Sequence, residues 1–151
     1  MPYRLHHPSN SLREVFLLIG ARDEVLWSDA SNSAVHLPDS RARWEVIWSR
    51  RERVVEIAHS HPVGPRTFSR EDETTMRALV TALGRPLLFS VVAPSGMIRR
   101  TESPGDEAVT TLVVDDEPWW TTLLRLASGM QNDSRSVRRV ATPNAIESKE
   151  Q

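Results

Sequence analysis

The residue types best suited to chemistry gather in one short stretch, HSHPVGPRTFSRED, at residues 59–72. His59 and His61 stand two residues apart, and Ser69 and Asp72 follow after a loop. Side chains at positions i and i+2 of a strand point to the same face, so both imidazoles could converge on one cation. The chain has no cysteine, so a metal would have to be held by histidine and carboxylate. Two imidazoles and one carboxylate make three ligands, which is the number in catalytic zinc sites that keep a fourth position for water.

The segments on either side of the loop are those needed to position these ligands. RVVEIAH, residues 53–59, is rich in β-branched residues and predicts a strand that ends at the histidine pair. SREDETTMRALVTALG predicts a helix, with Ser69 as its cap, acidic residues in its first turn and Gly84 as its stop. Asp72 therefore lies in the first turn, on the face that the helix buries. A carboxylate there is costly unless it is paired or bound to a metal.

A second interpretation of the same residues requires no chemistry. Ser69 and Asp72 also match a helix capping box, S-x-x-D, and a histidine pair on a strand is only a modest hint of a metal site. The combination of histidine pair, loop, cap and carboxylate is more specific than either part. It favours a metal site.

The remaining segments predict an α/β domain with a mixed sheet. Apolar runs indicate a buried strand followed by a short return strand, and a helix capped by Asp39 or Ser40 then carries Trp44, Ile47 and Trp48 on one apolar face. A hairpin, a further strand and a helix opened by Pro118 complete the pattern. The predicted segments are strands at 14–20 and 25–28, a helix at 40–50, a hairpin at 85–102 turning at Pro94, Ser95 and Gly96, a strand at 109–116 and a helix from 118.

Composition limits the domain count and the class of partner. The 151 residues, 39% of them hydrophobic and 26% charged, fit one domain over residues 1–127, with residues 128–151 as a polar, disordered tail. A net charge of -1 argues against a nucleic-acid partner held by bulk electrostatics. No apolar run is long enough to cross a membrane and no signal peptide is evident, so we expect a cytoplasmic location and no membrane partner.

These residues resemble the motif of the JAMM metalloproteases, the JAB/MPN family: an upstream glutamate, then H-[ST]-H-P, then a serine and an aspartate. HSHP at residues 59–62, Ser69 and Asp72 match this motif at the family's spacing. The resemblance covers about residues 12–115. It implies a single MPN domain of compact prokaryotic type, with a cytidine-deaminase-like mixed sheet flanked by helices.

The resemblance also implies roles for the matching residues. His59, His61 and Asp72 would bind one Zn²⁺ per chain. Ser69 would help to hold the carbonyl oxygen or the tetrahedral intermediate. A glutamate would activate water and then protonate the leaving amine.

Five glutamates are candidates for that last role. Glu14 opens the apolar strand EVFLLIG, which resembles the family's glutamate before an apolar run ending in glycine, so we choose Glu14. Its alternative interpretation is an exposed carboxylate at the start of a strand. Glu56 lies three residues from His59 on one strand and should face the opposite side of the sheet. The others, Glu24, Glu45 and Glu52, lie at a turn or along the preceding helix.

The resemblance implies a zinc-dependent protease or isopeptidase that acts at the C-terminal tail of ubiquitin or a ubiquitin-like protein. The partners would be that protein or its conjugate, together with activating and conjugating enzymes of the same pathway. Processing of a sulfur-carrier protein is an alternative with identical chemistry. A non-catalytic MPN scaffold is a third interpretation, against which the complete ligand set argues.

Overall fold

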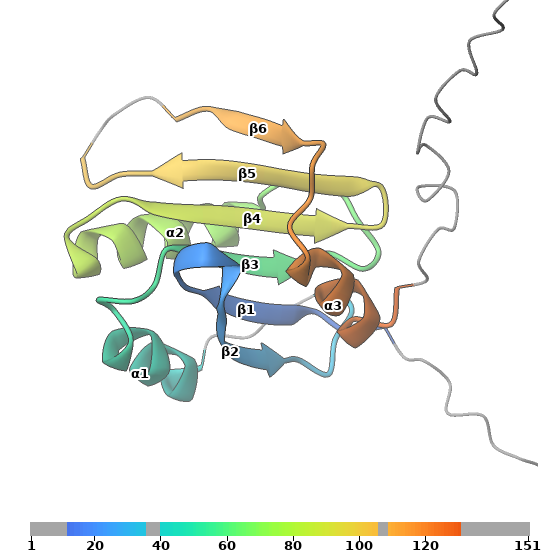
Figure 1. Ribbon diagram of the computed structural model, residues 1–151, viewed down its shortest axis with the longest axis horizontal. Helices are drawn as coiled ribbons and strands as arrows, with labels where there is room; N and C mark the ends of the chain where they lie inside the picture. Colours follow the sequence, from blue (N-terminus) through green and yellow to red (C-terminus); the bar gives the residue numbers. More distant parts are fainter. Residues whose placement is uncertain (1–11, 36–39, 106–108, 131–151) are drawn as a thin grey trace, which may run out of the picture.

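The computed structural model describes residues 12–35, 40–105 and 109–130. These residues form one six-stranded mixed sheet and three α-helices. The strand order is β2-β1-β3-β4-β5-β6 (Figure 1). The predicted α/β fold class, a mixed sheet flanked by helices, is therefore confirmed. The elements are β1 (Val15–Ile19), the 3-10 helix η1 (Ala21–Asp23), β2 (Val25–Ala30), α1 (Arg41–Ser49), β3 (Glu56–Ser60), α2 (Arg70–Leu83), β4 (Leu87–Ala93), β5 (Gly96–Glu102), β6 (Thr111–Val114) and α3 (Trp120–Ala127).

One parallel strand pair lies at the centre of the sheet. β3 and β4 run parallel. The chain must therefore cross back to the starting end of β3 before β4 begins, and α2 lies in this crossover. The other described pairs are antiparallel. The loop from the end of β3 to α2 therefore lies where the parallel strands end (Figure 1).

Each face of the sheet has its own apolar core. α1 and α2 cover one face, where Ile47 and Met76 pack with strand residues such as Phe16. α3 covers the other face, where Trp120 and Leu124 are fully buried. Figure 1 shows α3 and α2 on opposite sides of the strands. The two sides are called the α1/α2 face and the α3 face.

The predicted helix ends agree with the observed caps. Ser40 is the N-cap of α1 and accepts a hydrogen bond from the backbone N–H of Arg43. Ser69 is the N-cap of α2, and Gly84 follows that helix with φ at 68°, which favours glycine. The predicted hairpin turn is also confirmed, since β4 ends at Ala93 and β5 begins at Gly96.

Two expectations need correction. Trp48, predicted on the apolar face of α1, is 54% exposed. The guanidinium carbon of Arg51 lies 4.3 Å from the centroid of the Trp48 ring. The predicted boundary at residue 127 also falls too early for the packing, because Ser128 and Met130 are buried. The remainder of the predicted tail, residues 131–151, lies outside the described residues.

Candidate metal centre

Strand β3 and its extension position the two histidines on the α1/α2 face. His59 lies opposite Phe16 of β1 and Val91 of β4. His61 is one residue past the end of β3, but its N–H still donates to the carbonyl of Val92 at 2.9 Å. The extended backbone therefore continues through His61, and both imidazoles project on the same side, as the i, i+2 spacing predicts.

Asp72 is held at the start of α2 by a capping box. The backbone N–H of Ser69 donates to Oδ2 of Asp72 at 2.8 Å, and the Ser69 hydroxyl accepts from the N–H of Asp72 at 3.0 Å. The two interpretations of this motif are therefore not alternatives. The cap exists, and it fixes the carboxylate in an orientation that faces the two histidines.

The three side chains converge. Nε2 of His59 lies 2.9 Å from Nε2 of His61 and 3.3 Å from Oδ1 of Asp72. Nε2 of His61 lies 3.5 Å from Oδ2 of Asp72. Donors that are each about 2.0–2.1 Å from a tetrahedral zinc ion lie roughly 3.3–3.4 Å apart. The spacing of these donors, all within 4.8 Å of one another, therefore fits one ion of this kind. We call the three side chains the ligand cluster.

A hydrogen bond outside the cluster orients His61. Its Nδ1 lies 2.9 Å from the carbonyl oxygen of Pro65, in the loop that leads to α2. A carbonyl only accepts, so Nδ1 carries the proton and Nε2 remains available as a ligand atom. No sequence pattern indicates this contact, because the acceptor is a backbone atom.

The cluster has a strong electrostatic effect on its own members. Burial alone would raise the pKa of Asp72, but hydrogen bonds from His59 and His61 outweigh burial and lower that pKa well below its usual range. Burial alone would lower the pKa of His61, but the hydrogen bonds to Asp72 and Pro65 and the nearby carboxylates raise it. The carboxylate is therefore ionised and attracts positive charge.

Glu14 lies beside this cluster because of the register between β1 and β3. Phe16 pairs with His59 in an antiparallel ladder, so two residues back along β1 the position of Glu14 is opposite that of His61. The Oε1 atom of Glu14 is 4.0 Å from Nε2 of His61. Glu14 is only 6% exposed, which makes the interpretation as an exposed carboxylate wrong.

A buried hydroxyl junction holds the backbone next to Glu14. The N–H of Val15 donates to the hydroxyl oxygen of Ser60 at 2.8 Å, and the hydroxyl of Ser128 lies 2.6 Å from the same oxygen. The N–H of Arg13 donates to the carbonyl of Ser128 at 3.1 Å. The residues on both sides of Glu14 are thus tied to β3 and to the chain that follows α3.

The other candidate glutamates lie away from the cluster. Glu56 is buried on the α3 face, where it accepts from the hydroxyl of Ser90 and forms a two-pronged ion pair with Arg99 at 2.9 and 3.0 Å. The prediction that Glu56 faces away from His59 is correct. Glu24 and Glu45 pair with arginines on the surface, and Glu52 is exposed.

The hydroxyl of Ser69 can donate a hydrogen bond to a further partner. Its oxygen accepts from the N–H of Asp72, and its O–H can still donate. The residue is exposed and lies on the wall of the pocket that contains the ligand cluster. It is therefore placed where it could donate to an oxygen near the cluster.

The fold and the site define an α/β domain with a three-ligand cluster suited to a divalent metal. Comparison with protein families identifies it further: the family described as prokaryotic homologs of the JAB domain matches residues 3–121. The chain belongs to this family, and the suspected relationship to a compact prokaryotic JAB/MPN domain is confirmed. No curated protein matches the chain significantly. Membership is compatible with a metal-dependent hydrolase and with an MPN scaffold.

Within residues 12–35, 40–105 and 109–130, no helix combines the length and the apolar character needed to cross a bilayer.

Proposed function

We propose that this chain is a zinc-dependent peptidase or isopeptidase. The observation that carries the proposal is the convergence of His59, His61 and Asp72, with Glu14 buried 4.0 Å from the ring of His61. Two imidazoles and one carboxylate are a ligand set that zinc favours, and an acid–base residue beside them is the arrangement that hydrolysis requires. The ligand set together with a glutamate at its edge favours a hydrolase over a scaffold.

The three ligands would hold Zn²⁺, which when bound supplies Lewis acidity that lowers the pKa of water and polarises the scissile carbonyl. Glu14 would take a proton from the attacking water as the new C–O bond forms. It would then deliver that proton to the nitrogen as the C–N bond breaks, so that proton transfers balance. The Ser69 hydroxyl would donate a hydrogen bond to the developing oxyanion.

The proposed substrate is the C-terminal tail of ubiquitin or a ubiquitin-like protein, cleaved from a conjugate or a precursor. Family membership supports this choice, since the resemblance to JAMM metalloproteases implies that substrate class. Such a tail is extended and flexible, and it can lie along a strand edge. Processing of a sulfur-carrier protein is the second candidate, because it needs the same chemistry and a similar tail.

Zinc analysis and a cleavage assay together test the proposal. Purified protein is expected to bind one zinc ion per chain and to cleave fusions of ubiquitin-like or sulfur-carrier proteins to a reporter. A chelator should abolish cleavage, and added zinc should restore it. His61→Ala should lose both zinc and activity. Glu24→Gln is a suitable control, because Glu24 pairs with Arg53 on the surface and is remote from the cluster.

The outcomes separate the competing functions. Zinc binding with chelator-sensitive cleavage supports the peptidase, and the preferred fusion distinguishes ubiquitin-like from sulfur-carrier substrates. Zinc binding without cleavage across the panel favours the scaffold. A protein that binds no zinc under any condition overturns the metal site itself.

A further inference from the structure

The outer side of α3 carries three large apolar side chains that are exposed. Trp119, the N-cap of the helix, Leu123 and Leu126 have exposed fractions of 59%, 42% and 60%. Their i, i+4, i+7 spacing places them on one side of the helix, over a length of about 10 Å. The opposite side packs on the sheet through Trp120 and Leu124, which are fully buried. A helix that is apolar on both sides is typical of one that is covered on both sides.

We call Trp119, Leu123 and Leu126 the α3 stripe. A hydrogen bond holds the indole of Trp119 in its exposed position, because its Nε1–H donates to the carbonyl of Asp23 at 3.0 Å. The polar end of the ring is thus satisfied within the chain, and its apolar surface remains exposed. A tryptophan of this kind is a frequent anchor in protein interfaces.

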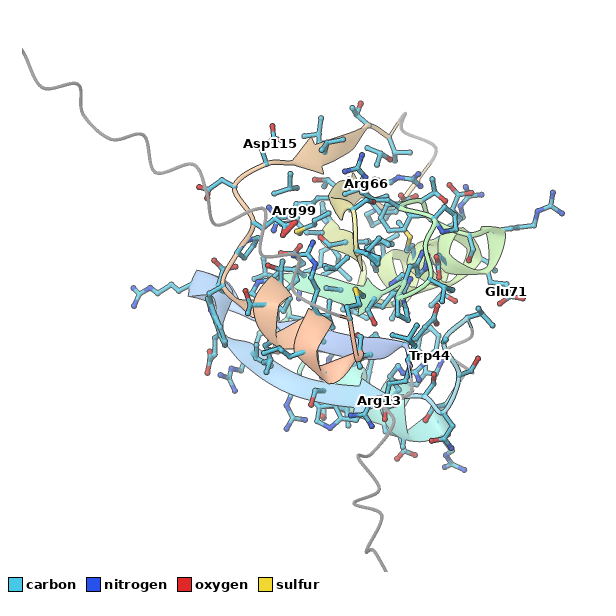
Figure 2. All side chains as sticks on the ribbon, turned by 90° about the vertical axis from the view of Figure 1, so that its right-hand side faces the viewer. Arg13, Trp44, Arg66, Glu71, Arg99 and Asp115 are labelled. Carbon is cyan, nitrogen blue, oxygen red and sulfur yellow. The ribbon has the colours of Figure 1, made fainter. Side chains whose placement is uncertain are left out.

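The two ends of the α3 stripe differ in charge. At the C-terminal end, Arg13 is exposed, and its Nε–H donates to the carbonyl of Ala127 at 2.8 Å. On the N-terminal side, Asp115 and Asp116 are exposed in the segment that leads from β6 into α3. Figure 2 labels Arg13 and Asp115, and α3 lies between them in this view. The surface is therefore positive at one end and negative at the other.

The other charged groups near the N-terminal end largely compensate one another. Glu117 accepts a hydrogen bond from the guanidinium of Arg125 at 2.9 Å. Arg22 and Asp23 are neighbours in η1, and both are exposed. The excess of negative charge at this end therefore comes from the two aspartates that precede the helix.

We propose that the α3 stripe is the interface of a homodimer in which the α3 helices of two protomers pack antiparallel. A two-fold axis through the middle of the stripe would bring the apolar side chains of both copies together. It would also place Arg13 of each protomer opposite Asp115 and Asp116 of the other, so that the favourable charge contact forms twice. The dipoles of the two helices would oppose each other favourably as well.

The charge pattern is the reason for choosing a second copy as the occupant. A surface with one positive and one negative end is complementary to itself after a half-turn, whereas a parallel arrangement would bring like charges together. The inference goes beyond the proposed function and does not depend on it. The interface would be small, with a short apolar centre between two charged ends, so we expect a Kd of about 10–100 µM.

Sedimentation velocity of the full chain tests self-association. Measurements from about 5 to about 500 µM bracket the expected Kd. The weight-average sedimentation coefficient should rise from that of a monomer to that of a dimer across this range. A protein that remains a monomer at every concentration would overturn the inference.

Two leucines with the same exposure provide a matched pair of variants. Leu126 lies in the α3 stripe and is 60% exposed, and Leu112 lies on β6 and is 61% exposed. Leu126→Gln should raise the Kd at least about tenfold, because a two-fold interface loses the side chain twice. Leu112→Gln should leave the Kd within about twofold of the wild type. Association that Leu126→Gln leaves intact, or that Leu112→Gln abolishes instead, would overturn the inference.

A charge exchange tests the antiparallel arrangement itself. Arg13→Glu is one variant, and the other combines Asp115→Lys with Asp116→Lys. In low-salt buffer each variant alone should raise the Kd about five- to tenfold, because like charges then face each other at both ends. An equimolar mixture should associate within about threefold of the wild-type Kd, because both contacts of the mixed dimer again join opposite charges.

The melting temperature of each variant serves as the folding control. It should stay within about 4 °C of the wild-type value, since all of these positions are exposed. A mixture of the folded variants that associates no more tightly than either variant alone would overturn the proposed arrangement.

Discussion

The two faces of the sheet each bury a glutamate, and the surroundings of these glutamates differ. On the α3 face, Glu56 is paired with Arg99 through two hydrogen bonds and also accepts from Ser90. On the α1/α2 face, Glu14 lies 4.0 Å from His61 at the edge of the ligand cluster and lines a pocket. Both carboxylates are buried, with exposed fractions of 3% and 6%.

The difference teaches that burial alone does not identify a reactive carboxylate. Glu56 has a cation and a hydroxyl within direct hydrogen-bonding distance. These contacts link β3 to β4 and β5. Glu14 faces imidazoles that could share a metal ion, and it lies next to a space that a substrate could enter. Proximity to the ligand cluster and access to the pocket separate the two roles.

The largest expected effect concerns Glu14. Glu14→Gln should lower turnover by about 10²- to 10⁴-fold, because it removes the proposed proton acceptor. Zinc content should stay unchanged, since Glu14 is not one of the three ligands. Cleavage rates and metal analysis on the same preparation measure this. Unchanged turnover in zinc-loaded Glu14→Gln would show that another group performs the acid–base step.

Glu56 should behave in the opposite way. Glu56→Ala should lower the free energy of unfolding by about 3 kcal/mol, because Arg99 loses its partner in a mostly buried pair. Urea denaturation measures this loss, and the folded fraction should still bind zinc. The double variant Glu56→Ala, Arg99→Ala is the control, and it should recover part of the lost stability. A destabilisation below about 0.5 kcal/mol would show that the ion pair of Glu56 contributes no more to stability than an ordinary surface contact.

A smaller effect is expected at the junction that positions Glu14. Ser60→Ala removes the acceptor of the buried Val15 N–H and should cost about 1–3 kcal/mol. Activity should fall as well, because the backbone beside Glu14 loses this tie to β3. Ser49→Ala is a control on the surface of α1, where the hydroxyl bonds within its own helix. Equal stability of the two variants would argue against a role for the junction.

The smallest effect is a pH dependence of stabilisation by zinc. A raised His61 pKa means that the protonated ring stabilises the metal-free fold at low pH, and this contribution is lost as the pH rises through the folded pKa. Zinc requires the neutral ring, so the rise in melting temperature caused by zinc should be larger at about pH 8 than at about pH 6. Differential scanning fluorimetry with and without zinc measures it. A zinc effect that is equal at both pH values would exclude His61 as a ligand.

Local signals allowed much of this architecture to be predicted. The cap, the acidic first turn and the final glycine of α2 all lie within the helix or next to it, so Ser69 and Gly84 mark its ends correctly. The i, i+2 spacing likewise placed His59 and His61 on one face. These features depend on residues that are close in the sequence.

Features that depend on distant segments could not be derived in this way. The position of Glu14 opposite His61 follows from the register of β1 against β3, which neither segment specifies alone. The exposure of Trp48 reflects how α1 sits on the sheet, and its own periodicity carries no such information. The pocket that contains the ligand cluster is lined by residues of β1, β3, α1 and α2 together with loop residues, so no single segment predicts it.

The capping box at α2 also has a consequence for the choice of ion. Oδ2 of Asp72 accepts the N–H of Ser69, so Oδ1 is the carboxylate oxygen without that commitment. An ion that demanded both oxygens would compete with the helix cap, at a cost of about 1 kcal/mol. Calcium takes six to eight oxygen ligands and often binds carboxylates through both oxygens, whereas zinc is satisfied by four ligands. We therefore expect the helix cap to favour an ion that takes one oxygen of Asp72, as zinc can, over an ion that takes both.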